Sequence, residues 1–166
     1  MLASKTILFL ALASASGATM AAAAEDTPPA PSVFVKKAAQ DGMTEVQLGK
    51  IALDKSQNEQ IREFAQRMVA DHGKANDELA SLAKSKGIDA PKTLDAEHEA
   101  MVKKMDAKSG AAFDADYAKA MSMDHTKAIA LFESASKSAD ADLAAFAKKT
   151  LPTLKEHKQL ANKLPK

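Results

Sequence analysis

The chain of 166 residues contains no cysteine, no tryptophan and a single tyrosine. Without cysteine it can form no disulfide, so packing alone must hold the fold together, even under oxidising conditions. Aromatic residues make up only 4% of the sequence, and β-branched residues are scarce as well. Alanine, leucine, lysine, methionine and glutamate are abundant instead, and these residues favour helices over strands. The composition therefore predicts an all-α protein.

The sequence also lacks an excess of charge of either sign, with 23 lysines and arginines against 22 aspartates and glutamates. Such a balance gives no electrostatic reason to expect binding to nucleic acid or to an anionic membrane surface. Three motifs of common enzymes are missing too: a phosphate-binding glycine loop, a nucleophile elbow and the His-Glu-x-x-His zinc motif. These absences argue against an ordinary hydrolase or transferase and against a nucleic-acid partner.

The first 24 residues have the three-part pattern of a secretory signal peptide. Lys5 precedes the apolar run "TILFLALASA", and small residues ending in "TMAAAA" offer a cleavage site after Ala24. A retained membrane anchor is the alternative, but the run is short for a helix that spans a bilayer. We therefore expect a periplasmic or secreted protein without membrane insertion after cleavage. The Pro-rich stretch "EDTPPAPS", residues 25–32, is expected to form a flexible spacer.

Helical periodicity begins after this spacer and predicts one helical domain over residues 33–162. Ser32 is a candidate N-cap for the first helix, and Gly87 is placed to end the second. Pro152 lies inside the last helix and should kink or break it near Lys148, because proline has no amide proton to donate to that carbonyl. The expected long helices span about 33–55, 58–86, 111–137 and 139–162, and a shorter helix starts at Thr93 or Asp95.

The lengths of the connections predict the topology. The first two and the last two long helices are joined by only a few residues, so each pair should form an antiparallel hairpin. The middle connection, residues 87–110, takes more than twenty residues and carries the short helix. One long crossover of this kind is a feature of ferritin-like bundles. We therefore expect a ferritin-like four-helix bundle rather than a simple up-down-up-down bundle.

Two internal similarities run through these helices. Residues 64–79 and 117–132 share an aromatic residue followed by Met-x-x-Asp-His at identical spacing, 53 positions apart. Residues 53–65 and 135–147 are similar at an offset of 82, and they mark the turn into the second helix of each pair. A duplicated hairpin explains the second similarity, but alanine-rich helices also match one another by chance.

Stepping alternately four and three residues along each long helix gives the stripe of residues that should face the core. Every such stripe is mostly apolar, and every stripe contains a residue that can bind a metal. Burying unpaired polar side chains is costly, so one such residue on every helix requires an explanation. One explanation is a site for a divalent metal inside the bundle, since imidazole and carboxylate suit zinc or iron and thioethers suit copper. The candidate ligands are Glu45, His72, His125 and His157, with Asp71, Asp124, Met68 and Met121 as secondary candidates.

The same residues admit a second interpretation, a polar layer without any metal. His72 and His125 could form hydrogen bonds with Glu45 or Tyr117 inside the bundle and so fix the register of the helices. In both interpretations the two histidines should face the interior and approach Glu45. The aspartate before each histidine should lie on the helix flank, where it could pair with the lysine three residues later. His98 stands between two glutamates and is expected on a solvated face.

Three observations count against a metal site. The first long helix has an alternative apolar stripe through Val35, Ala39, Val46 and Leu53, which would move Glu45 towards a flank. The Glu-x-x-His pairs of di-iron bundles are absent, because Val69 and Ser122 stand three residues before the histidines. Counted from the hairpin turn, Glu45 and His72 are offset by about four residues, or roughly 6 Å along the helix axis. His157 lies further off, nearer the distal end of its helix.

Three stretches carry a resemblance to a known family: "GMTEVQLGKIALDKSQNEQIREFAQRMVADHGKAN", "YAKAMSMDHTKAIALFESA" and "LPTLKEH". Together they resemble the exported bacterial family named domain of unknown function 4142, a member of the ferritin-like superfamily, over roughly residues 33–161. The resemblance implies a ferritin-like helical bundle in the periplasm, and it implies little about activity.

We therefore expect a non-catalytic binding protein or an envelope stress-related protein, with a polar centre that binds a divalent metal or only fixes the bundle. The alternative is a metal-dependent oxidoreductase of the di-iron type, against which the missing Glu-x-x-His pairs count. The residues identify neither a substrate nor a protein partner, and they leave open whether the bundle forms a homodimer.

Overall fold

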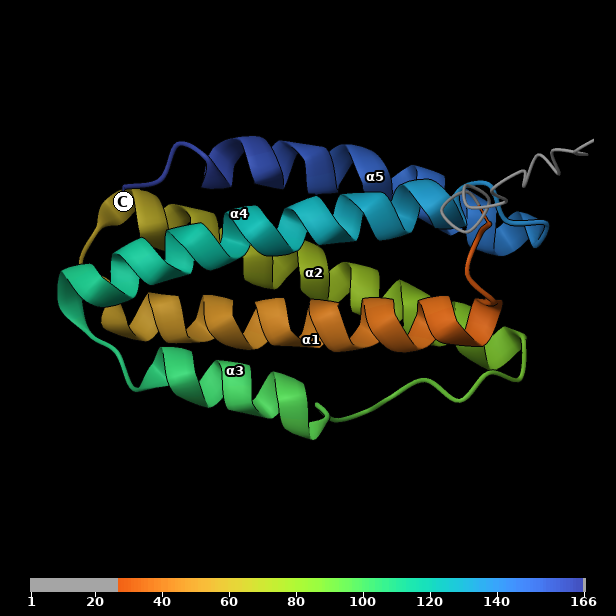
Figure 1. Cartoon of the computed structure of the whole chain (residues 1–166), viewed down its shortest axis with the longest axis horizontal. Coiled ribbons are helices and arrows are strands. Elements are labelled where there is room, and N and C mark those ends of the chain that lie inside the picture. Colours follow the sequence, from red (N-terminus) through yellow and green to blue (C-terminus); the bar gives the residue numbers. More distant parts are fainter. Residues whose placement is uncertain (1–26, 166) are drawn as a thin grey trace, which may run out of the picture.

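A computed structural model describes residues 27–165, which form an all-α bundle without any strand in that part of the chain (Figure 1). The predicted signal peptide, residues 1–24, lies outside the described residues. Among the described helices, none combines the length and the apolar character that crossing a lipid bilayer requires. The helices are α1 (Pro31–Lys55), α2 (Glu59–Ser85), α3 (Ala96–Asp106), α4 (Gly110–Ala135) and α5 (Ala141–Ala161).

The four long helices lie side by side as two antiparallel hairpins, α1 with α2 and α4 with α5 (Figure 1). The chain leaves α2 at one end of the bundle and enters α4 at the other end. The connection between them runs back along the bundle and carries α3, which packs on α1. The predicted four-helix bundle with a long crossover is therefore confirmed.

The two hairpin turns are built in the same way, as the similarity at an offset of 82 predicts. Asn58 caps α2 and Asp140 caps α5, and each side chain accepts a hydrogen bond from the backbone amide three residues later. A serine two residues before each cap accepts a hydrogen bond from the amide of the cap residue itself. These bonds satisfy amides that the first turn of a helix leaves free.

The ends of the helices agree with the sequence in part. Gly87 has a φ of +66° and follows α2, and the amide of Ile88 donates to the carbonyl of Ala83, so this helix ends in a Schellman motif as expected. The expected N-cap at Ser32 is wrong, because α1 already begins at Pro31. Proline suits the first position of a helix, where its missing amide proton is not needed.

Of the kink or break expected at Pro152, the break is wrong, since α5 continues through this residue to Ala161, and the kink stays a prediction. Proline leaves the carbonyl of Lys148 without its usual helical partner. Both Lys148 and Pro152 lie on the exposed face of α5, so water can satisfy that carbonyl.

The interior of the bundle consists of two apolar clusters with a polar layer between them. One cluster holds Phe34, Phe132 and Phe146, whose ring centroids lie 5.0 to 6.3 Å apart. The other cluster holds Phe113 and Tyr117 among its aromatic residues, together with several aliphatic side chains. Four buried polar residues separate the clusters: Glu45, His72, His125 and His157.

Close packing of α1 against α2 depends on glycine. A Cβ atom at Gly49 would lie 2.9 Å from Cγ2 of Val69 and 3.2 Å from the backbone oxygen of Ala65. A Cβ atom at Gly42 would collide with the side chain of Asn76. Both glycines therefore allow α1 to approach α2 near the polar layer.

This packing predicts opposite effects of alanine at two helical glycines. Gly49→Ala should destabilise the protein by about 1–3 kcal/mol, because the backbone oxygen of Ala65 cannot move away easily. Gly73→Ala is the matched control, since nothing lies within 4 Å of its added Cβ, and it should stabilise the protein by about 0.4–1 kcal/mol. Urea unfolding of both variants measures the two effects. A Gly49→Ala protein as stable as the parent would contradict the described packing.

Candidate metal centre

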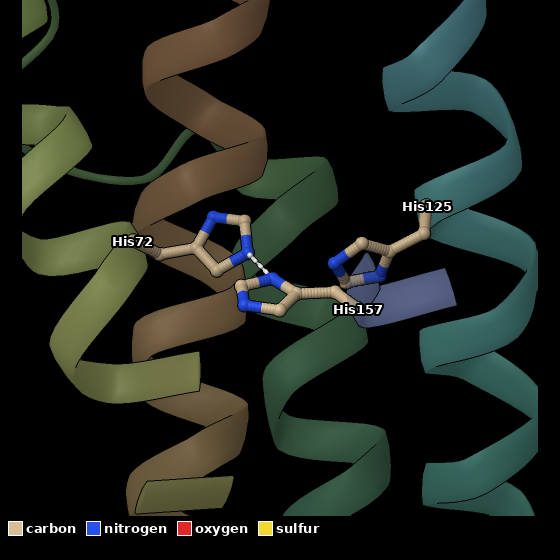
Figure 2. A group of neighbouring side chains, drawn as sticks. All are labelled: His72, His125 and His157. Atoms are coloured by element: carbon tan, nitrogen blue, oxygen red, sulfur yellow. Dashed lines mark hydrogen bonds between the residues drawn. The ribbon is translucent and has the colours of Figure 1, made fainter. Parts of the chain in front are cut away.

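The polar layer brings together one buried side chain from each long helix: Glu45 of α1, His72 of α2, His125 of α4 and His157 of α5. Figure 2 shows the three imidazole rings pointing toward one another from three different helices. His72 and His125 also approach the carboxylate of Glu45, at 2.9 Å and 3.5 Å. The expectation that both histidines face the interior and approach Glu45 is confirmed.

Glu45 and His72 are offset along the helix axis, and this offset counted against a contact between them. The two side chains nevertheless meet, because they lean along the axis toward each other. Side chains on a helix lean toward its N-terminus. In the first hairpin Glu45 leans away from the turn and His72 leans toward it, so the two side chains converge. The same holds in the second hairpin for His125 and His157. The objection from residue counting is therefore wrong, because it treated side chains as perpendicular to the axis.

Each histidine uses one ring nitrogen in a hydrogen bond to an oxygen atom at the edge of the centre. The three contacts are His72 Nδ1 to Glu45 Oε2 (2.9 Å), His157 Nε2 to Asp71 Oδ2 (2.9 Å) and His125 Nδ1 to the Met121 carbonyl (2.8 Å). Histidines that bind a metal are oriented in this way, by a carboxylate or a carbonyl on the nitrogen that faces away from the ion. We call these three nitrogens the outer nitrogens.

The remaining three nitrogens, called the inner nitrogens below, face the centre. His72 Nε2 and His157 Nδ1 lie 3.2 Å apart, and His125 Nε2 has no hydrogen-bond partner among the described residues. One ligand atom from each of the three histidines lies within 4.8 Å of the others. A tetrahedral zinc ion, with nitrogens at about 2.0–2.1 Å, needs them roughly 3.4 Å apart. Small rotations of the rings would therefore let this group hold a metal ion.

Without an ion, the charges in the centre are balanced by one close pair. Burial alone would raise the pKa of Glu45, but the neighbouring His72 outweighs burial and lowers it. Burial alone would lower the pKa of His72, but the Glu45 carboxylate outweighs burial and raises it. This close contact favours a charged His72 beside the Glu45 carboxylate, and His72 Nε2 lies 3.2 Å from His157 Nδ1.

Burial disfavours protonation of the other two histidines. It lowers the pKa of His125, and it lowers the pKa of His157 to about 4 against the opposing hydrogen bond that His157 donates to Asp71. His125 Nδ1 donates to the Met121 carbonyl, so its Nε2 carries a free lone pair. Tyr117 also has a buried hydroxyl without a partner in residues 27–165, and burial together with the Glu45 charge raises its pKa.

The secondary candidates are placed differently from one another. Asp71 orients His157 and lies 3.7 Å from Arg67, so it does not depend on the lysine three residues later. Asp124 Oδ1 lies 3.7 Å from Lys127 Nζ, so this aspartate pairs with the lysine three residues later, as expected. The side chains of Met68 and Met121 are buried in the apolar cluster that also holds Tyr117.

The expectation for His98 is wrong, because its ring is mostly buried rather than solvated. It lies 2.6 Å from Asp95 and 3.4 Å from Asp41, and so ties α3 to α1. The contact of His125 with the Met121 carbonyl was not predicted from the sequence. The spacing of four residues between them was the available signal, but a ring rotamer decides whether such a contact forms.

Solvent comes close to the centre through a surface pocket of about 150 Å³ between α2 and α5. His72 and His157 form part of its lining, together with Asp71 and the ion pair of Glu78 and Lys149. An ion could reach the histidines by this route without separation of the helices, which meets the need of a buried site for an entry path.

Comparisons with known proteins place this geometry in context. The family model described as "Domain of unknown function (DUF4142)" matches residues 16–164. A solved structure of a DUF305 fragment from Deinococcus radiodurans has a similar fold, with a TM-score of 0.71 and 16% sequence identity. The similarity covers 82% of this chain and 95% of that one, and at this identity it shows the fold alone. No curated protein matches the chain.

The neutral state of His157 predicts that the ion-free protein is acid-sensitive. Its pKa in the folded protein, about 4, lies below the ordinary value of about 6.5. The unfolded chain therefore binds this proton first, and stability present above about pH 6.5 is lost as the pH falls toward 4. Between pH 7.5 and pH 5 the loss from this residue should be about 2 kcal/mol. His125, whose pKa is also lowered, adds to the loss, whereas His72, whose pKa is raised, opposes it.

Urea unfolding in the presence of a chelator measures this dependence. The variant His157→Leu should lose less stability than the parent over the same pH range. Equal losses in the two proteins would show that His157 takes up no proton on unfolding.

Proposed function

The chain belongs to the DUF4142 family of domains of unknown function, and from its buried centre we propose that it binds a single transition-metal ion through His72, His125 and His157. The family name assigns no activity, so the proposal is based on the residues of this chain. The centre acts as a binding site rather than a catalytic one, in a protein exported to the periplasm or the exterior.

The two nitrogens of each histidine ring have different surroundings, and this observation supports the proposal most directly. All three outer nitrogens are held by oxygen atoms, and one ligand atom from each of the three histidines lies within 4.8 Å of the others. A polar layer that served only to fix the register would need no free lone pair at its centre. The unpaired Nε2 of His125 costs about 1–3 kcal/mol in such a layer, whereas a metal ion would use it.

The choice of ion follows from the ligand type. Neutral imidazole suits zinc, copper(II), iron or nickel, and three histidines with a fourth open position form a known type of zinc site. Met68 and Met121 belong to the apolar cluster, and the proposed ligand set consists of the three imidazoles alone. Glu45 would remain hydrogen-bonded to His72 and balance part of the charge of the ion.

The alternative of a di-iron oxidoreductase finds little support in this set of ligands. Di-iron bundles use four glutamates and two histidines. Within the described part of the chain, the centre has three histidines and one glutamate, and that glutamate is already bonded to His72. Membership of the ferritin-like superfamily stays part of the proposal, supported by the two hairpins and the long crossover.

Export is supported by the signal-peptide pattern of residues 1–24. By binding a transition metal in the periplasm or outside the cell, the protein would keep the ion from other proteins. This would be its role in envelope stress. A catalytic role would need a substrate at the open position, and no described residue identifies one.

Metal-dependent stability tests the proposal. Zinc at a hundredfold excess over Kd should stabilise the untagged protein by about 2.7 kcal/mol and raise its Tm, because only the folded chain presents the complete site. The variant His125→Gln should lose most of this shift. His98→Gln is the matched control, since His98 also bonds carboxylates but lies outside the centre, and it should keep the shift. An equal zinc shift in His125→Gln and the parent would refute the site, as would no shift in the parent.

A further inference from the structure

Three polar contacts join α2 to α5 along the seam where these two helices meet. They are Arg67 to Glu156 (3.0 Å), Asp71 to His157 (2.9 Å) and Glu78 to Lys149 (2.8 Å). The second contact orients a proposed ligand of the metal. The third lies about two turns further along α2 and involves neither a ligand nor a partner of one, so it calls for a separate explanation.

The surface pocket described above occupies the seam between the second and the third contact. Its lining extends from Asp71 and His157 at one end to Glu78 and Lys149 at the other, and it includes His72. Both of these histidines are buried although they belong to the lining. An ion inside the pocket would therefore lie next to two of the three proposed ligands.

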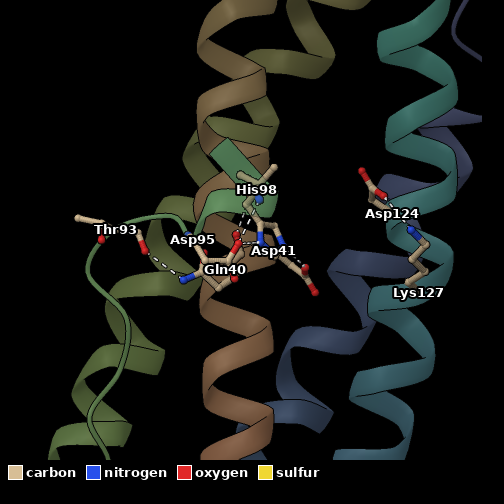
Figure 3. Close-up of polar contacts among 8 residues, drawn as sticks. Gln40, Asp41, Thr93, Asp95, His98, Asp124 and Lys127 are labelled. Carbon is tan, nitrogen blue, oxygen red and sulfur yellow. Dashed lines mark hydrogen bonds and ion pairs between the residues drawn. The ribbon is translucent and has the colours of Figure 1, made fainter. Parts of the chain in front are cut away.

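The opposite flank of the centre is covered by the crossover. His98 of α3 lies 3.4 Å from Asp41 of α1 (Figure 3). Gln40 of α1 donates a hydrogen bond to the backbone oxygen of Thr93, just before α3 (Figure 3). The cavity on this flank reaches Glu45, but its lining contains none of the three proposed ligands. The seam between α2 and α5 is therefore the better route between solvent and the histidines.

The ion pair at the outer end of the pocket is built to open and close. The hydrogen bond from Lys149 lowers the pKa of Glu78, so the pair is ionised at neutral pH. Lys149 is 65% exposed, and an exposed pair of this kind breaks and forms again at little cost. While it is formed, it ties α5 to α2 and neutralises Glu78. Once it is broken, the free carboxylate attracts a divalent cation to the pocket.

The backbone of α5 is weakened at the same level. Pro152 lies one turn after Lys149 and just over one turn before His157. Because proline donates no hydrogen bond to the carbonyl of Lys148, α5 lacks one of its helical bonds beside the pocket. Local opening costs less where such bonds are missing. The stretch of α5 that lines the pocket can therefore move away from α2 without unfolding the whole helix.

We propose that the ion pair of Glu78 and Lys149 is a gate on this pocket, which controls the access of solvent and ions to the three histidines. The inference rests on the proposed function, because the gate regulates the rate at which the metal ion enters and leaves the centre. Neither residue binds the ion. The gate therefore sets both rates together and leaves the affinity nearly unchanged.

Stopped-flow measurement of zinc uptake, and of zinc release to a coloured chelator, tests the gate. Lys149→Gln should raise both rates by about two- to fivefold, the range expected for loss of an exposed ion pair, and keep Kd within about twofold. Exchanging the two charges in the double variant E78K/K149E restores an ion pair and should return both rates toward those of the parent. Lys155→Gln is the matched control. It breaks the 2.7 Å pair with Glu133 on the other flank of α5, away from the pocket, and should change neither rate.

Deuterium exchange at the ring carbon between the two nitrogens of each histidine gives a second readout, which needs no metal. In the metal-free protein, Lys149→Gln should accelerate this exchange at His72 and His157, and Lys155→Gln should not. Zinc binding by the parent with unchanged rates and unchanged ring exchange in Lys149→Gln would overturn the gate and leave the proposed function standing. If the parent binds no zinc, the proposed function fails, and ring exchange alone decides whether the pair controls access to the centre.

Discussion

The buried contact between His72 and Glu45 is the interaction on which the rest of this structure depends. A carboxylate and an imidazole inside an apolar bundle are stable only when they satisfy each other, so the two helices that carry them must be in register. Gly42 and Gly49 allow α1 to lie close enough to α2 for this contact. The pair also divides the interior into two apolar clusters, each with its own group of aromatic rings.

The polar layer costs stability that an apolar layer would not, and it leaves the inner nitrogens in position for a ligand. Oxygen atoms fix the outer nitrogens, so the rings are oriented before an ion arrives and little ordering remains for binding. His72 Nε2 and His157 Nδ1 lie 3.2 Å apart, and a metal must replace this contact. A metal also binds imidazole in its neutral form, which links its binding to pH.

The sequence predicts the fold well, because long helices, capped turns and one long connection are local features. The similar stretches 53–65 and 135–147 indicated the two hairpin turns, and the apolar stripes indicated which faces meet. The centre could be predicted only as a set of candidates, because the meeting of Glu45 and His72 depends on how side chains lean along antiparallel helices. The contacts of His98 depend on the path of the crossover, which periodicity alone does not define.

The central claim, that the three inner nitrogens form a metal site, is tested most directly by the ¹⁵N NMR signals of the histidine rings. Before zinc is added, His72 should carry protons on both nitrogens, and His125 should carry one on Nδ1 only. Zinc should remove one proton from His72 and shift the inner nitrogen of all three rings, while the outer nitrogens keep their protons. A proton on Nε2 of His125, or inner nitrogens that do not respond to zinc, would contradict the account.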